Sequence, residues 1–193
     1  MNAPDALTRL ERIAPWTAQP QAIRTVLFDA GFTLLQLNPS IPVIVCRVCQ
    51  REGIAVTEDA LAERLALAEE RFAGAQHLAR HTWADNAAIT AAWTDYFTEL
   101  VRPFASGDAL ARCLRAIQAE FDRHSAWQPY PDVLPALDAL RGRFTLGVIS
   151  DWSIALGEIL RDLHLTAYFN VLVVSATSRR AKPDPHLFHT ALE

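Results

Sequence analysis

The architecture follows from residues 25–33, Thr25-Val26-Leu27-Phe28-Asp29-Ala30-Gly31-Phe32-Thr33. Apolar residues bounded by a glycine predict a short buried strand that ends at Asp29. A carboxylate at the end of a buried strand is unfavourable unless it has a partner or a use, and ligands of open parallel sheets bind at this edge. We therefore expect Asp29 to be a nucleophile or a metal ligand, and Thr33 to be a hydrogen-bond donor to an oxyanion.

Lys182 is the single lysine among the 18 Lys and Arg residues of the chain. It lies in the segment Ala181-Lys182-Pro183-Asp184-Pro185. A lysine ammonium is a compact point charge that suits one anionic atom in a confined site, whereas arginine presents a planar fork. Two interpretations stay open from this residue alone: a lysine kept for a site, or one surface lysine in an arginine-rich chain.

Composition limits the class of protein. The chain has 193 residues, 51% of them hydrophobic, and a net charge of -4, which allows a substantial core and gives no basic stripe for nucleic acid. No apolar run approaches the roughly 18 residues of a membrane span. Residues 1–21 lack the apolar region of a secretory signal, so we expect a cytoplasmic protein with an N-terminal arm over 1–21.

Two spacings are similar to those of metal sites, but both are incomplete. Cys46 and Cys49 form a CxxC pair without a second one, and Cys113 leaves an odd count that does not fit a disulfide framework. His77 and His81 are four residues apart, but no glutamate follows His77 as a zinc protease would require. Buried cysteines in a reducing compartment and a surface histidine pair are the interpretations that we favour.

The region between this strand and the next is mostly helical. Helices are predicted over Ile41–Arg51, from a cap at Thr57, over Asp85–Val101, and from a cap at Asp108. Strand patterns return at Phe144–Ile149 and at Val171–Val174, with a helix over Ser153–His164 between them. A strand, a helix and a strand in this order form a parallel crossover unit.

This order of elements predicts an α/β protein with a parallel sheet. The sheet and its helices would be formed by residues 22–37 and 128–193, and residues 38–127 would be an all-helical insertion that covers the carboxyl edge as a cap. Trp83, Trp93, Arg80 and His81 could line a pocket under the cap or belong to its core or surface.

Polar groups follow all three predicted strands. Asp29 and Thr33 follow the first, Ser150 follows the second, and Lys182 follows the third just before a helix that Asp184 can cap. Because parallel strands end at one edge, we expect these groups to converge there. A carboxylate, two hydroxyls and an ammonium suit displacement at phosphorus, in which the carboxylate attacks and the other groups bind the phosphoryl oxygens.

The chain resembles the haloacid dehalogenase-like (HAD) hydrolases in residues 26–34, in Leu146-Gly147-Val148-Ile149-Ser150, and in Lys182-Pro183-Asp184-Pro185. The resemblance implies a Rossmann-like core with a helical cap inserted after its first strand. It also implies that Asp29 is the nucleophile, that Thr33 and Ser150 bind phosphate, and that Lys182 neutralises charge between them. Mg²⁺ would contact Asp29 and the main-chain carbonyl of Gly31.

Two departures from the family pattern bear on activity. Phosphatases of the family usually carry an acid/base Asp where this chain has Gly31, and loss of such a group lowers rates by about two to four orders of magnitude. The last family motif, which supplies further metal ligands, is absent before Glu193. We expect a core that is incomplete at its C-terminus, with the first strand exposed at an edge that a homodimer or a complementing segment would cover.

These features predict a Mg²⁺-dependent phosphatase-type hydrolase that acts on a small phosphorylated metabolite. The alternative is a catalytically impaired family member that binds a ligand or partner. A 2-haloacid dehalogenase is disfavoured because the family's dehalogenases usually have Tyr, Asn and Tyr where this chain has Gly31, Asp151 and Phe188. A phosphonate hydrolase is disfavoured because residues 38–127 contain no lysine for a Schiff base. Asp151 is unusual beside a phosphate site because like charges repel.

Overall fold

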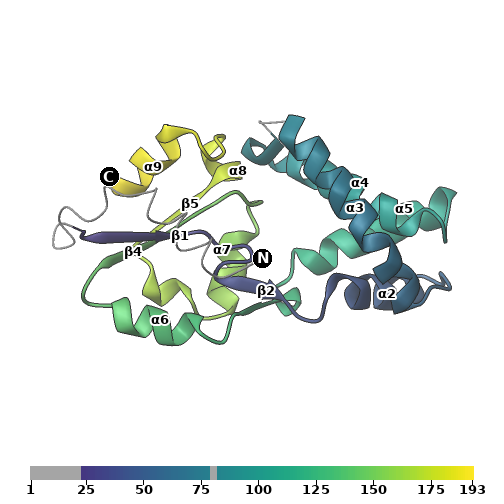
Figure 1. The fold of residues 1–193 in the computed structure, drawn as a ribbon, viewed down its shortest axis with the longest axis horizontal. Coiled ribbons are helices and arrows are strands. Elements are labelled where there is room, and N and C mark those ends of the chain that lie inside the picture. The colour runs from purple at the N-terminus through teal and green to yellow at the C-terminus, as the bar shows by residue number, and fades with distance from the viewer. Residues whose placement is uncertain (1–22, 79–81) are drawn as a thin grey trace, which may run out of the picture.

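A three-stranded parallel sheet forms the centre of the computed structural model, which describes residues 23–78 and 82–193. Strand β4 (Thr145–Ser150) lies between β1 (Thr25–Phe28) and β5 (Val171–Val174), and both pairings are parallel (Figure 1). The prediction of an α/β fold with these three strands in parallel is therefore confirmed. The N-terminal arm expected over 1–21 lies outside the described residues.

Helices cover both faces of the sheet because successive strand residues point to opposite sides. Leu146 and Val148 of β4 pack with α6 (Val133–Leu140) and α7 (Leu156–Asp162). Ile149 of β4 and Val173 of β5 pack on the other face with α9 (Pro185–Leu192). The short elements η5 (Thr166–Tyr168) and α8 (Ser175–Ser178) flank β5. Figure 1 shows α6 and α9 on opposite sides of the strands.

The helical insertion has a core of its own. Its elements are α2 (Ile41–Arg51), α3 (Glu58–Leu78), η3 (Thr82–Ala84), α4 (Asn86–Val101), α5 (Gly107–Phe121) and η4 (His124–Ala126). Thr57 caps α3 through its side-chain oxygen, as predicted. The helix predicted over Asp85–Val101 begins one residue later, because Asp85 is its N-cap and accepts the backbone N–H of Ala88. The prediction that Asp108 caps the fourth helix was wrong, because Ser106 is the N-cap and Asp108 lies in the first turn, where an acidic side chain favours the helix dipole.

A two-stranded antiparallel ribbon joins the insertion to the sheet. Strand β2 (Leu35–Leu37) pairs with β3 (Trp127–Pro129), so that Leu37 lies opposite Trp127. Three-residue strands are too short to show the alternation that identifies a strand in sequence, and the ribbon was not predicted. The limits predicted for the core (22–37 and 128–193) and for the insertion (38–127) stay predictions.

The three cysteines are free and buried inside the insertion, in agreement with the structural interpretation of the CxxC pair. The Sγ atoms of Cys49 and Cys113 are 3.5 Å apart, and the Cys46 thiol contacts the Val56 carbonyl at 3.4 Å. The side chains of His77 and His81 lie outside the described residues. Among the residues that are described, no three His, Cys, Asp or Glu side chains form a group that could hold a metal ion.

Over residues 23–78 and 82–193, β1 pairs only with β4, so its other edge has no strand beside it. The helices in the same ranges are all too short or too polar to cross a lipid bilayer.

Gly147 in the middle strand lets side chains of the two neighbouring strands approach closely, and its replacement tests this packing. A Cβ atom at this position would lie 2.5 Å from Cγ1 of Val171 and 2.8 Å from Cδ2 of Leu27. We expect Gly147→Ala to lower the free energy of unfolding by about 1–3 kcal/mol, as overpacking does, measured by urea denaturation. The matched control is Gly74→Ala in α3, where no atom lies within 4 Å of the added Cβ and a gain of about 0.5–1 kcal/mol is expected. Equal effects of the two substitutions would contradict this account.

Candidate active site

A tight turn after β1 places Asp29 at the carboxyl edge of the sheet. The Ala30 carbonyl accepts hydrogen bonds from the backbone N–H groups of Thr33, Leu34 and Leu35 at 3.3, 2.9 and 2.9 Å. Phe32 takes a φ of 56°, which is uncommon for a residue with a Cβ atom. The chain therefore reverses within a few residues, and Thr33 returns towards the Asp29 carboxylate.

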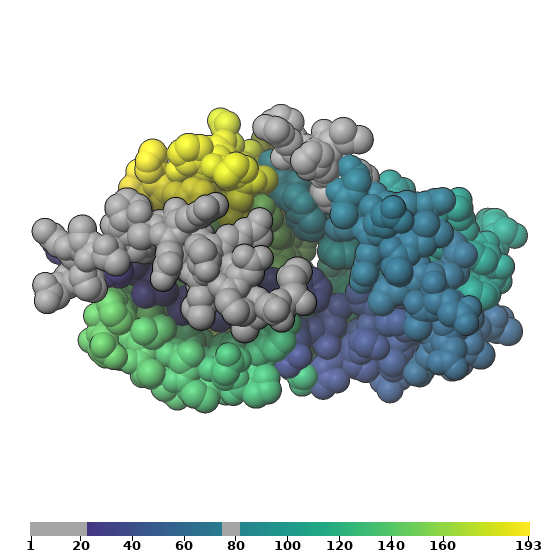
Figure 2. Space-filling view, viewed as in Figure 1, coloured from purple at the N-terminus to yellow at the C-terminus, as the bar shows by residue number. Residues whose placement is uncertain are grey.

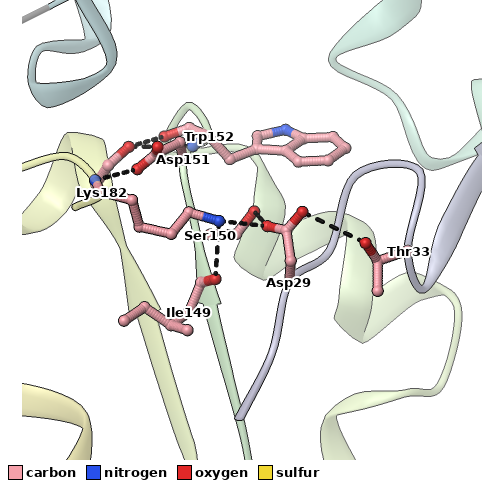
Figure 3. Close-up of polar contacts among 8 residues, drawn as sticks. Asp29, Thr33, Ile149, Ser150, Asp151, Trp152 and Lys182 are labelled. Atoms are coloured by element: carbon pink, nitrogen blue, oxygen red, sulfur yellow. Dashed lines mark hydrogen bonds and ion pairs between the residues drawn. The ribbon is translucent and has the colours of Figure 1, made fainter. Parts of the chain in front are cut away.

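The four predicted site residues meet at this edge (Figure 3). The Lys182 ammonium donates to Oδ1 of Asp29 at 2.8 Å, and the Ser150 hydroxyl donates to the same oxygen at 3.0 Å. The Thr33 hydroxyl is 3.5 Å from Oδ2, a long hydrogen bond. Lys182 also contacts the Ile149 carbonyl at 3.5 Å. The expected convergence of a carboxylate, two hydroxyls and an ammonium is present, and their chemical roles stay predictions.

The loop after β4 holds Lys182 by its backbone. The Asp151 carboxylate accepts the backbone N–H of Lys182 at 3.0 Å, and the Trp152 N–H donates to the buried hydroxyl of Ser175 at 3.1 Å. Burial raises the pKa of the Asp151 carboxyl, the negative charge of Asp29 adds to the rise, and the hydrogen bond from Lys182 and its positive charge oppose it. Asp151 therefore holds the segment that carries Lys182. Asp184 caps the following helix by accepting the His186 N–H at 2.9 Å, as predicted.

The indole of Trp152 lies over Gly31. A Cβ atom at Gly31 would be 2.9 Å from Cζ3 of Trp152, a distance that real Cβ contacts essentially never show. Figure 3 shows the ring extending above the Asp29 carboxylate. The space that a side chain at position 31 would enter is therefore filled by an aromatic ring. This arrangement was not predicted, because the direction of a side chain in a loop such as that of Trp152 has no periodic pattern in the sequence.

A cavity of about 390 Å³ opens onto Asp29 and Lys182 and extends between the sheet edge and the insertion. Trp83 and Trp93 line it, as the sequence analysis allowed, while Arg80 and His81 lie outside the described residues. Sequence reasoning missed Trp152 and Trp127, whose rings are 4.6 Å apart in the wall nearest the sheet. Trp127 lies in a three-residue strand and Trp152 in a loop, so neither belongs to a periodic pattern that predicts where its side chain points.

One hydrogen bond joins the insertion directly to the loop of the site. The backbone N–H of Ile154 donates to the side-chain oxygen of Asn86, the first residue of α4, at 3.1 Å. Ile154 follows the residues that contact Lys182 and Gly31. The position of the cap is therefore linked to the loop that shapes the site.

The chain is similar in sequence to the proteins of one hydrolase family. A family model described as haloacid dehalogenase-like hydrolase matches residues 23–193. Haloacid dehalogenase-like hydrolase domain-containing protein 3 of Danio rerio is 26% identical over 181 residues, which cover 89% of this chain and 71% of that protein. Such identity over most of the chain supports a common fold and leaves the substrate open.

Solved structures agree at the level of the fold. The HAD-hydrolase YfnB of Bacillus subtilis, solved bound to magnesium, matches with a TM-score of 0.67 and 19% identity over 86% of this chain and 70% of that chain. The L-2-haloacid dehalogenase of Xanthobacter autotrophicus matches with a TM-score of 0.56 and 19% identity over 87% and 63%. At this identity the likeness shows the fold and does not select a reaction.

The raised pKa of Asp151 predicts a pH-dependent stability difference. In the folded protein this carboxyl binds its proton more tightly than in the unfolded chain, so its contribution is most favourable at low pH. That contribution to stability is lost as the pH rises from 3.8, the ordinary pKa of an aspartate, through the higher pKa that Asp151 has in the folded protein. Asp151→Asn keeps an acceptor for the Lys182 N–H but removes the buried charge. We expect its Tm to exceed that of the wild type by about 1–3 °C near pH 7 and to equal it near pH 3.

Scanning calorimetry of the ligand-free protein measures this difference. The matched control is Asp132→Asn at the exposed start of α6, where the side chain makes no capping hydrogen bond. A lower Tm for Asp151→Asn near pH 7 would show that the hydrogen bond and the charge of Lys182 outweigh burial.

Proposed function

The chain belongs to the haloacid dehalogenase-like hydrolase family, as its sequence motifs indicated, and from this we propose that it is a phosphatase-type hydrolase. Its substrate would be a small phosphorylated molecule whose phosphoryl group passes to Asp29 and then to water. The observation that carries the proposal is the ion pair between Lys182 and Asp29 at 2.8 Å, at the mouth of a cavity that would hold the rest of the substrate.

The hydrogen bonds on Asp29 select the oxygen that would attack. Lys182 and Ser150 both donate to Oδ1, whereas Oδ2 receives, from the described part of the chain, only the long contact from Thr33. Oδ2 therefore keeps lone pairs for phosphorus, while Oδ1 holds the carboxylate in place. An ammonium has three N–H groups, so Lys182 can also donate to a phosphoryl oxygen as negative charge grows there.

We propose that a magnesium ion binds on the sheet side of the cavity. Asp29 and Asp151 both line the cavity there, and Mg²⁺ is usually bound by one or two carboxylates, with water and substrate phosphate filling the other positions. Asp29 and the main-chain carbonyl of Gly31 would hold the ion, with Asp151 as a further carboxylate. When bound, the ion would neutralise charge on the phosphoryl oxygens.

A second candidate function is ligand binding without turnover. It is favoured by the ring of Trp152, which occupies the space over Gly31 where the resemblance implies an acid/base group. In that case the Asp29–Lys182 pair would bind a phosphorylated ligand and leave its ester bond intact. The two candidates differ in whether Asp29 becomes phosphorylated.

Asp29→Asn tests the proposed function directly. With 4-nitrophenyl phosphate and Mg²⁺, we expect the wild type to release phosphate and the variant to be at least about a thousandfold slower, because the nucleophile is lost. Mg²⁺ should also raise the Tm of the wild type more than that of the variant, and EDTA should abolish turnover. Asp132→Asn is the matched control and should retain full activity. Equal turnover by wild type and Asp29→Asn would overturn the proposal, and phosphate binding without turnover would support the second candidate.

Gly31→Asp combined with Trp152→Ala tests whether the ring excludes an acid. Alone, Gly31→Asp must displace the indole 2.9 Å away, so we expect a lower Tm and no gain in kcat. In the double variant the carboxyl has room, and kcat for an alkyl phosphate, whose alcohol needs a proton as it leaves, should rise above that of Trp152→Ala by about a hundredfold, the lower range for a positioned acid/base. The four kcat values form a double-mutant cycle. An equal gain from Gly31→Asp with and without Trp152 would show that the ring does not hold this space.

A further inference from the structure

The cavity beside Asp29 has aromatic walls on both sides. Phe32, Trp127 and Trp152 line it from the sheet side, and Phe72, Trp83 and Trp93 line it from the insertion. The rings form continuous surfaces: Trp127 and Trp152 lie 4.6 Å apart edge to face, and Phe72 stacks on Trp93 at 4.8 Å. Aromatic walls of this kind bind flat apolar groups through stacked and edge-to-face contacts. Figure 2 shows the sheet side and the insertion as two lobes that lie side by side.

The charges of the cavity restrict the ligand further. Among the described residues that line it, Lys182 is the one cation, and its ammonium is already paired with Asp29. Asp151 on the sheet side and Asp122 in the insertion add negative charge. A second phosphate or a carboxylate on the substrate would have no cation to bind and would be repelled.

The residues around Asp29 also favour one type of leaving group. Gly31 offers no carboxyl, and the Trp152 ring stands over it. A phenol has a pKa of about 10. The pKa of water is near 15.7, and we take that of an aliphatic alcohol to be similar. A phenolic oxygen therefore leaves as an anion far more readily without a positioned proton donor.

We propose that the substrate is an aryl phosphate, a phosphate monoester of a phenol-type alcohol whose ring carries no further negative charge. This inference rests on the proposed function and names the substrate class for the same site. Oδ2 of Asp29 forms a bond to phosphorus while the bond from phosphorus to the aryl oxygen breaks, and its electron pair leaves on that oxygen. Water then cleaves the aspartyl-phosphate to regenerate Asp29 and gives inorganic phosphate, and a proton from water restores the phenol.

Binding of phosphonates, whose carbon–phosphorus bond a phosphatase does not cleave, tests the inference without turnover. Titration calorimetry on the wild type with Mg²⁺ would compare benzylphosphonate with methylphosphonate, and a 4-aminomethyl with a 4-carboxy derivative of benzylphosphonate. We expect the benzyl compound to bind at least about tenfold more tightly than the methyl compound because its ring meets the aromatic walls. The aminomethyl derivative should bind more tightly than the carboxy derivative. Equal affinities within either pair would overturn the inference.

Two cavity variants and a matched control show whether the cavity rings cause the difference in affinity. Trp93→Leu and Trp83→Leu should each weaken benzylphosphonate binding by about three- to tenfold and leave methylphosphonate binding unchanged. Phe104 packs against the same helical core but does not line the cavity, so Phe104→Leu should change neither affinity. A loss of benzylphosphonate affinity in Phe104→Leu as large as in both tryptophan variants would overturn the inference, because the effect would then come from the folding of the insertion.

Turnover separates this inference from the proposed function. In the wild type with Mg²⁺, kcat/KM for 2-naphthyl phosphate should exceed that for glucose 6-phosphate by at least about a hundredfold, and Trp93→Leu should raise KM for the naphthyl ester alone. Faster turnover of glucose 6-phosphate would overturn the aryl inference while supporting the phosphatase function. Tight benzylphosphonate binding with no turnover of any ester would overturn the phosphatase function and leave the aryl specificity of the cavity supported.

Discussion

The ion pair between Asp29 and Lys182 is the constraint on which the site depends. The two residues are 153 positions apart, and their side chains meet at 2.8 Å because β1 and β5 flank β4 in a parallel sheet and send their loops to the same edge. A partly buried carboxylate needs such a partner. Because Lys182 and Ser150 share one carboxylate oxygen, the other oxygen remains available for chemistry.

The insertion decides what can reach that oxygen. It folds around its own apolar core, joins the sheet through the β2–β3 ribbon, and contacts the site loop through Asn86 and Ile154. The cavity lies between two separate cores, and its walls combine rings from both. Aromatic rings beside the Asp29–Lys182 pair strengthen electrostatic interactions there by lowering the local dielectric constant. The proposed apolar specificity and the proposed reaction at Asp29 are therefore compatible in one cavity of about 390 Å³.

The loop after β4 links these two parts of the site. Ser150 contacts Asp29, Asp151 holds the backbone of Lys182, and the Trp152 ring lies over Gly31. Gly31 and Trp152 fit each other: a side chain at position 31 would collide with the ring, and the ring adds aromatic surface where the family resemblance implies a carboxyl. The surroundings of Asp29 therefore differ from those that the family resemblance implies, and function has to be argued from the site and not from the fold.

The sequence by itself determined the three strands, the helices of the insertion and the meeting of Asp29, Ser150 and Lys182. Apolar periodicity identifies such elements, and the parallel order of strands places their ends together. The tertiary structure alone decided the β2–β3 ribbon, the Trp152 ring over Gly31 and the aromatic walls of the cavity. The physical reason is that an aromatic residue has the same helical or loop spacing whether it fills a core or faces a cavity, and only packing between distant segments distinguishes the two.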